Sequence, residues 1–167
     1  ISSCYNSGSV KGKLDAGGIA AIQNGGTGRI TKSYNEGTVN ANSYAGGIVG
    51  ENDSKIDNCY NSGKVRGNDN AGGIAGANAK TVTNVYCSGT VTGDDIVGAL
   101  IGRNTGTLSN AFWLDTIGKL SIGLSDSLGK QSLVSKVTHD ELSGQIKIKT
   151  LNGYKLLTDI MNANNAT

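Results

Sequence analysis

Apolar and polar positions recur with a fixed pattern along the first two thirds of the chain. An aromatic residue is followed by glycine after three positions and by valine after five, in the segments 3–10, 32–39, 58–65 and 84–91. A glycine-led apolar run then follows in each unit, at 17–20, 46–50, 72–76 and 98–102. The aromatic position advances by 29 residues once and then by 26 residues three times, through Tyr5, Tyr34, Tyr60, Tyr86 and Phe112. The extra residues of the first unit predict a loop insertion around 25–28.

A unit of 26 residues with no helical or leucine-rich period is typical of one coil of a parallel β-solenoid. We expect three short strands in each coil, for example 56–60, 63–65 and 73–76, separated by Asn, Asp and Gly turns. Stacked coils would pair each strand with its copy above and below, about 4.8 Å away. The fold class predicted is therefore all-β, a parallel β-solenoid (β-helix) of about four coils over residues 1–113.

Side chains alternate along a strand, so the inward positions of the repeat can be separated from the outward ones. In the third unit the inward set is 59, 61, 63 and 65, whereas 62, 64 and 66 point outward. The core should consist of three stacked sets of aliphatic residues: Val10, Val39, Val65 and Val91; Ile19, Ile48, Ile74 and Leu100; and Ile30, Ile56, Val82 and Leu108. The paired glycines before each apolar run predict a corner where a Cβ would collide with the neighbouring coil.

Composition supports a narrow solenoid and excludes several classes of partner. There are 26 glycines, no proline and only 5% aromatic residues, so the backbone must turn often and pack closely. A net charge of +2 without charge runs predicts no nucleic-acid partner. No stretch reaches the roughly 18 apolar residues of a membrane span, and no signal peptide is visible. The chain opens inside a repeat at Ile1, so we expect a piece of a longer protein.

Residues 114–167 depart from the repeat and are predicted to form a C-terminal capping segment. Thr138 and Glu141 have the spacing of a helix capping box, which predicts a short helix there. An apolar stripe over 151–161 predicts a second helix that would cover the exposed end of the core. The domain prediction is thus a solenoid over 1–113 and a small mixed or helical cap over 114–167.

The repeated units resemble the GLUG motif. The resemblance rests on Gly46-Gly47-Ile48-Val49-Gly50-Glu51-Asn52 and on Cys59-Tyr60-Asn61-Ser62-Gly63, and it extends over residues 1 to about 113. Proteins with such repeats include large secreted or wall-attached bacterial proteins, among them adhesin-like molecules and the non-catalytic part of zinc metallopeptidases that cleave immunoglobulin A. The resemblance implies an extracellular or cell-surface location and a structural or display role, with other domains of a larger parent protein as partners.

No catalytic residue, metal site or cofactor is predicted. A zinc peptidase needs an H-E-x-x-H pair, and this chain has one histidine, His139, which we interpret as a solvated helix residue. Turn aspartates do not follow a calcium-binding spacing. Cys4 and Cys59 would lie two coils, about 9.6 Å, apart, beyond the roughly 7 Å limit of a disulfide, and Cys87 is out of register. We expect three free thiols that act as small buried fillers.

Two kinds of side chain are predicted to stack along the solenoid. Asparagines should form two hydrogen-bonded ladders, one of Asn6, Asn35 and Asn61, the other of Asn52, Asn78 and Asn104 with Asn24 nearby. The aromatic ladder has outward parity, and the candidate ligand-binding residues on it are Tyr5, Tyr34, Tyr60 and Tyr86. Packing is the favoured interpretation of this ladder, and a flat platform for a sugar chain is the alternative.

Three functions remain open at this point. The first is a non-catalytic structural or display module of a secreted or cell-surface bacterial protein. The second is an adhesive module that binds a glycan or a host protein through the aromatic ladder. The third and least favoured is a polysaccharide-cleaving β-helix enzyme, because the acidic residues scatter among turns instead of clustering on one face.

Overall fold

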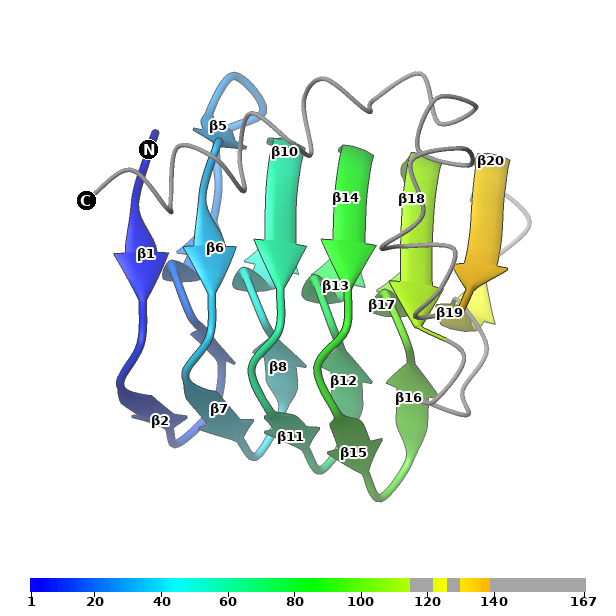
Figure 1. Ribbon diagram of the computed structural model, residues 1–167. Coiled ribbons are helices and arrows are strands. Elements are labelled where there is room, and N and C mark those ends of the chain that lie inside the picture. Colours follow the sequence, from blue (N-terminus) through cyan, green and yellow to red (C-terminus); the bar gives the residue numbers. More distant parts are fainter. Residues whose placement is uncertain (115–121, 126–129, 139–167) are drawn as a thin grey trace.

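The computed structural model describes residues 1–114, 122–125 and 130–138, and within these ranges the chain forms a parallel β-solenoid (Figure 1). All strand pairs are parallel and join equivalent residues of consecutive coils, such as Val39, Val65 and Val91. The described elements include no helix. In particular, none of them is a helix with the length and apolarity that a membrane crossing needs. The all-β parallel solenoid predicted from the repeat is confirmed.

Each complete coil contributes to four sheets, where three were expected. Sheet A contains β1 (Tyr5–Asn6), β6 (Tyr34–Asn35), β10 (Lys55–Asn61), β14 (Thr81–Cys87), β18 (Thr107–Leu114) and β20 (Lys130–Val137), with β5 (Arg29–Thr31) also paired to β10. Sheet B contains β2 (Ser9–Gly12), β7 (Thr38–Ala41), β11 (Val65–Gly67) and β15 (Val91–Gly93). The additional sheet, C, contains β3 (Ala16–Gly17), β8 (Tyr44–Gly46), β12 (Asn70–Gly72) and β16 (Ile96–Gly98). Sheet D contains β4 (Ala20–Gln23), β9 (Val49–Asn52), β13 (Ala75–Asn78), β17 (Ile101–Asn104) and β19 (Ile122–Ser125).

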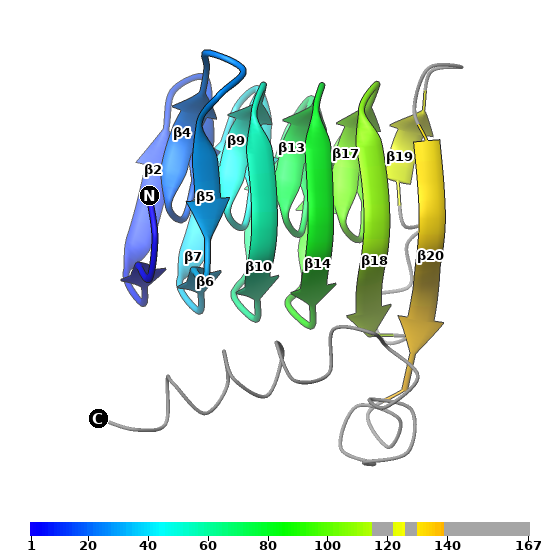
Figure 2. The same cartoon turned by 90° about the horizontal axis from the view of Figure 1, so that it is seen from above.

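Parallel pairing continues beyond the expected boundary at residue 113. Strand β19 pairs with β17, and strand β20 pairs with β18 over its whole length from Lys130 to Val137. The two strands thus extend sheets D and A by a further layer, although their sequences no longer follow the repeat (Figure 2). The helices expected after Thr138 and along 151–161, and His139, lie outside the described residues.

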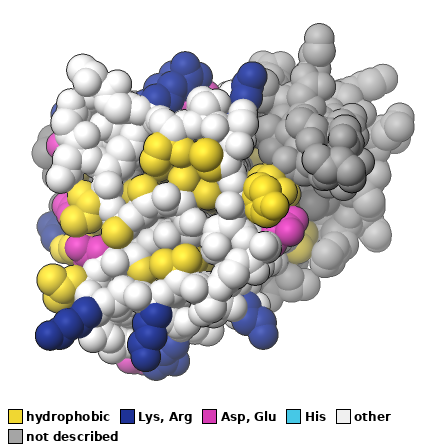
Figure 3. All heavy atoms as spheres, turned by 90° about the vertical axis from the view of Figure 1, so that its left-hand side faces the viewer, with side chains coloured by type: hydrophobic (Ala, Val, Ile, Leu, Met, Phe, Trp, Pro, Cys, Tyr) yellow, Lys and Arg dark blue, Asp and Glu magenta, His cyan; other side chains and the backbone are white. Residues whose placement is uncertain are grey.

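The core follows the predicted inward positions. Ten of the twelve predicted aliphatic residues are buried, and the other two, Val10 and Ile19, are partly buried and pack against the same cluster. Both belong to the first coil, whose strands β1 to β4 are the edges of their sheets. Hydrophobic side chains are visible on this end of the molecule (Figure 3). In the first coil, Ile1, Tyr5, Leu14 and Ile22 are exposed.

Every layer of sheet A has one residue in the left-handed backbone region. These residues are equivalent in the repeat and have φ between 47° and 58°: Ser3, Lys32, Asn58, Asn84, Asn110 and Leu133. Left-handed backbone shifts the alternation of side chains by one position, and so Ile56 and Cys59 are both buried although they are three residues apart. Asparagine tolerates this conformation better than most residues, which fits its presence in three of the six layers.

The paired glycines lie where the chain passes from sheet C to sheet D. A Cβ on Gly47 would overlap the carbonyl oxygen of Gly73 in the next coil and the side chain of Asn61 inside the solenoid. A Cβ on Gly18 would overlap Gly47 and Asn35 in the same way, and a Cβ on Gly73 would overlap Ala99 and Cys87. The predicted collision with the neighbouring coil is confirmed. The inward side chain of sheet A is a second reason for glycine at this position.

We therefore expect that Gly47→Val prevents folding or lowers the free energy of unfolding by about 3 kcal/mol or more, since backbone of the next coil must move. Gly8→Ala is a matched control, because its Cβ would lie 3.7 Å from Asn6 Oδ1, an ordinary contact. This control should change stability by less than about 0.5 kcal/mol. Thermal and denaturant unfolding measure both variants, and equal effects would contradict the proposed packing.

Candidate functional site

The aromatic ladder lies on the outer face of sheet A, opposite the inward asparagines. Tyr5, Tyr34, Tyr60 and Tyr86 occupy equivalent positions in consecutive strands, followed by Phe112 in β18. The rings of Tyr5 and Tyr34 are stacked with centroids 5.3 Å apart and planes at 11°, and those of Tyr34 and Tyr60 with centroids 4.9 Å apart and planes at 6°. The four candidate tyrosines are thus brought into one line.

Exposure falls steadily along this ladder. Tyr5 is 65% exposed, Tyr34 and Tyr60 are intermediate, Tyr86 is 7% exposed and Phe112 is 1% exposed. Tyr86 and Phe112 form an apolar cluster with Leu114 and Val137, separate from the main core, and Tyr60 packs against it. Burial raises the pKa of Tyr86 to about 12. The ladder is therefore exposed at one end and part of a second small core at the other.

Stacking limits what the exposed part of the ladder can bind. A sugar packs on the face of an aromatic ring, but the facing surfaces of Tyr5, Tyr34 and Tyr60 are already in contact with one another. Ring edges and hydroxyl groups lie outside these stacking contacts, and the Tyr60 hydroxyl hydrogen-bonds to Glu36 Oε1 at 3.5 Å. Tyr5 has an aromatic neighbour on one side only, because β1 is the edge strand of sheet A. The geometry favours packing within the ladder over a flat sugar platform.

Both predicted asparagine ladders are present and lie inside the solenoid. Asn6, Asn35 and Asn61 are joined by amide hydrogen bonds of 2.7 Å, each Nδ2 donating to the Oδ1 of the next coil. Asn61 then donates to Cys87 Sγ at 3.7 Å, because cysteine replaces asparagine in the following coil. The second ladder, Asn52, Asn78 and Asn104, has the same 2.7 Å spacing. Its first-coil position is held by Gln23, next to Asn24, which was expected nearby.

A third asparagine ladder was not predicted. It consists of Asn58, Asn84 and Asn110, the left-handed residues of sheet A, and the amide of Asn84 donates to Asn58 Oδ1 at 3.0 Å. In this ladder the amide donates toward the preceding coil, opposite to the direction in the two inward ladders. The recurrence of asparagine at 26-residue intervals was the available signal in the sequence.

The three cysteines are free, as expected, but they do not all fill the core. Cys59 and Cys87 are buried, and burial raises the pKa of the Cys59 thiol to about 12 and that of Cys87 to about 11. Cys4 is exposed, so its predicted burial is wrong. Cys4 directly precedes β1, the edge strand of sheet A.

Acidic residues are engaged in separate contacts. The Asp57 carboxylate is buried and receives two hydrogen bonds from the Arg29 guanidinium and one of 3.2 Å from Thr31 Oγ1. Asp94 pairs with Arg66 at 3.3 Å on the surface. Within the described ranges, no three His, Cys, Asp or Glu residues gather as metal ligands would.

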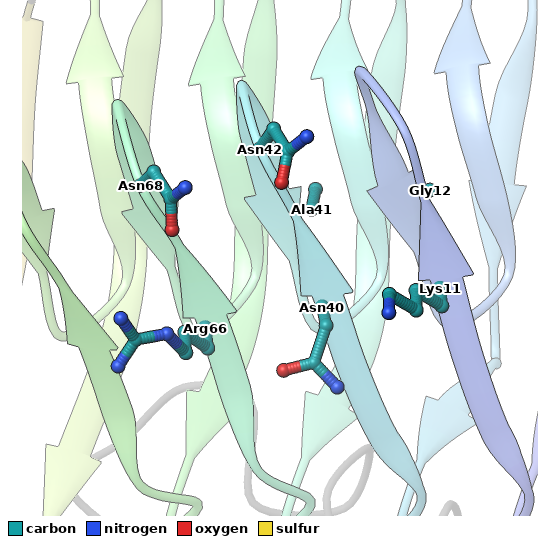
Figure 4. A pocket seen from close by; sticks show the side chains of 7 residues that line it. All are labelled: Lys11, Gly12, Asn40, Ala41, Asn42, Arg66 and Asn68. Carbon is teal, nitrogen blue, oxygen red and sulfur yellow. The ribbon is translucent and has the colours of Figure 1, made fainter.

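A shallow depression on the outer face of sheet B was missed by the sequence analysis. This sheet B groove has a volume of about 370 Å³ and is lined by Lys11, Gly12, Asn40, Ala41, Asn42, Arg66 and Asn68 (Figure 4). Lys11, Asn40 and Arg66 come from adjacent strands at equivalent positions, and Asn42 and Asn68 from the turns that follow. Gly12 and Ala41 alternate with this row: Ala41 is buried in the core, and a Cβ on Gly12 would meet the backbone of Asp15. Position 66 was predicted to point outward, and the equivalent positions 11 and 40 of the other coils could have identified this row from the sequence.

The fold and the stacked ladders define a repeat protein of the parallel β-solenoid class. Residues 41–66 match the GLUG motif, so the resemblance seen in the repeated residues is confirmed for this unit. The structure is similar to the crystal structure of a candidate immunoglobulin A1 protease from Bacteroides ovatus, with 22% sequence identity and a TM-score of 0.58. This match covers 79% of the present chain and 57% of the other, and at that identity it shows a shared fold. No curated protein sequence matches the chain.

The inward ladders lead to a first expectation about stability. Asn78→Ala should lower the free energy of unfolding by about 2 to 4 kcal/mol, because it removes the bonds to Asn52 and Asn104 and leaves buried amide groups unpaired. Asn42→Ala is the control, as this exposed side chain has no hydrogen-bond partner in the described part of the chain, and it should cost less than about 0.5 kcal/mol. Urea unfolding compares the two, and similar losses would show that the ladder adds no stability.

The buried thiols predict a loss of stability at alkaline pH. In the unfolded chain a thiol ionises near its ordinary pKa of 9.0, whereas Cys87 and Cys59 stay protonated in the folded chain up to about 11 and about 12. The contribution of the two thiols to the free energy of unfolding is thus fully present below pH 9. Between pH 9 and 11 it falls by about 1.4 kcal/mol per pH unit for each thiol. Denaturant unfolding at pH 8 to 10.5 should show a shallower fall for Cys59→Ala.

Two features make the alkaline experiment specific. Alanine already occupies the position equivalent to Cys59 in β18, at Ala111, so the substitution fits the fold. Cys4→Ser is the control, because it removes a thiol that the fold does not bury. Equal slopes for the wild type and Cys59→Ala would refute the assignment to the buried thiol.

Proposed function

We propose that this chain is a non-catalytic structural and display module of a larger bacterial protein, located outside the cell or on its surface. The observation that carries the proposal is the continuity of stacking: parallel strand pairing joins all consecutive coils, and two internal ladders of amide hydrogen bonds support it. Such a body holds its two ends at a fixed separation and orientation. The bacterial extracellular setting is supported by the GLUG motif and by the shared fold with the Bacteroides ovatus protein.

The non-catalytic part of the proposal is supported by the chemistry of the described surface. The carboxylates of Asp57 and Asp94 are each paired with an arginine, Arg29 and Arg66, instead of forming the pair of carboxylates that a glycoside hydrolase uses. The burial that raises the pKa of the Cys59 and Cys87 thiols also keeps them protonated and away from substrates. Peptidase activity of the kind named for the neighbour would belong to other parts of such a protein.

Adhesion through the aromatic ladder is the second candidate function. One observation favours it: Tyr5, Tyr34 and Tyr60 are exposed or half-buried and form one stacked row on the outer face of sheet A. The stacking of Tyr34 between Tyr5 and Tyr60 counts against a longer platform. Binding to a glycan array that is lost on Tyr5→Ala and kept on Tyr34→Ala would support adhesion at this end.

The display function predicts a rigid body. Spin labels at Ser9→Cys and Thr90→Cys, both exposed and three coils apart, should give one narrow distance distribution in dipolar EPR, centred on about 14 Å plus the label length. The labelling uses a Cys4→Ser background, since Cys59 and Cys87 are buried. A broad or bimodal distribution would refute a rigid spacer.

Location is tested in the bacterium that makes the protein. An antibody raised against the solenoid should label intact cells or react with the culture medium, because the proposal places this module outside the cell. An antibody against a cytoplasmic enzyme of the same bacterium serves as the control for lysis. Labelling that requires permeabilised cells would contradict the display proposal.

A further inference from the structure

The sheet B groove combines positive charge with unused hydrogen-bonding groups. Asn40, Asn42 and Asn68 have no side-chain hydrogen bond to any residue in the described ranges, and neither does the Lys11 amine. The asparagines of the three ladders, in contrast, use their amides to bind the next or the preceding coil. The groove asparagines are thus not needed for the fold in the way the ladder asparagines are.

Charge in the groove comes from Lys11 in the first coil and Arg66 in the third, with Asn40 between them in one row of sheet B (Figure 4). Two coil steps separate the strands that carry these cations, about 9.6 Å, which is on the order of the length of a disaccharide. The carboxylate of Asp94 binds Arg66, but both side chains are more than half exposed, at 55% and 63%. An exposed ion pair of this kind contributes little stability, so an anionic ligand can replace Asp94.

The open shape of the sheet B groove and its lining residues favour one class of ligand over another. The only apolar side chain that lines the groove is Ala41, so it has no pocket for the apolar side chains of a peptide. Amide groups both donate and accept hydrogen bonds, which suits the hydroxyl groups of sugars. Lysine and arginine donors suit carboxylates and sulfate esters.

We propose that the sheet B groove binds a linear polysaccharide that bears anionic groups, either carboxylates or sulfate esters. Lys11 and Arg66 pair with anionic groups on sugar residues about two coil steps apart, and Asn40, Asn42 and Asn68 hydrogen-bond to the hydroxyl groups between and beside them. This site lies on sheet B, away from the tyrosines of sheet A, and binding there goes beyond a structural role for the solenoid.

The test measures binding of the whole chain to three hexasaccharides by calorimetry: a sulfated heparin fragment, an unsulfated oligogalacturonate and neutral maltohexaose. We expect binding of at least one anionic hexasaccharide, weakening as salt is raised, and no binding of maltohexaose. Comparison of the sulfated with the unsulfated hexasaccharide shows whether the groove prefers sulfate esters or carboxylates. Lys11→Ala and Arg66→Ala should each weaken binding by about tenfold.

Matched variants separate the groove from general positive charge. Lys64→Ala removes a cation from the same outer face, two residues from Arg66 and outside the groove lining, and should leave binding unchanged. Asp94→Asn should strengthen binding, because it frees Arg66 and removes a repelling charge. All four positions are exposed, and circular dichroism with thermal unfolding verifies that each variant is folded.

Several results would overturn the proposal. These are absence of binding to both anionic hexasaccharides at low salt, equal loss in Lys64→Ala, or equally tight binding of maltohexaose. Binding of a polyglutamate peptide as tightly as of the sugars, with no effect of Asn42→Ala or Asn68→Ala, would show that the groove takes acidic peptides instead. The rigidity measured by spin labels does not depend on these residues, so the two proposals can fail separately.

Discussion

Consecutive coils are held one strand spacing apart, about 4.8 Å, by parallel backbone hydrogen bonds, and the other features of the molecule depend on this constraint. It places every side chain against its own counterpart in the next coil. An inward asparagine meets an asparagine and forms an amide bond of 2.7 Å. An outward tyrosine meets a tyrosine and stacks at 4.9 Å. At Gly47 the same spacing leaves no room for a Cβ beside the Gly73 carbonyl. Repetition in the sequence is thus a direct result of backbone geometry.

The repeat predicted the features that depend on period and parity, and it missed those that depend on local conformation or on the ends. Inward valines and isoleucines, both asparagine ladders and the glycine corner followed from spacing alone. Sheet C was missed because a three-residue strand such as Asn70–Gly72 has the composition of a turn. The left-handed backbone at Asn58 has no glycine to mark it. Exposure of Cys4 and the graded burial of the tyrosines reflect what lies over each coil, which the repeated residues do not encode.

Stacking also determines where a partner can bind. Residues that are identical from coil to coil bind each other, so their hydrogen bonds or ring faces are occupied inside the stack. The outward row of sheet B differs from coil to coil and forms no such ladder: it reads Lys11, Asn40, Arg66 and Thr92. The sheet B groove lies in this row, and recurrence in the sequence therefore does not mark it. In such proteins residues that recur from coil to coil indicate the scaffold, and outward positions that differ between coils are candidates for ligand binding.

Because each coil contacts only the coils before and after it, the 26-residue unit is also a unit of genetic change. Removal of residues 53–78 would join Asn52 to Ala79, and Asn104 would then follow Asn52 in the same internal ladder. Such an event changes the length of the body by one coil, about 4.8 Å, and leaves every remaining register intact. Unequal recombination between repeats can therefore adjust the reach of this module in small steps, without any new residue being selected.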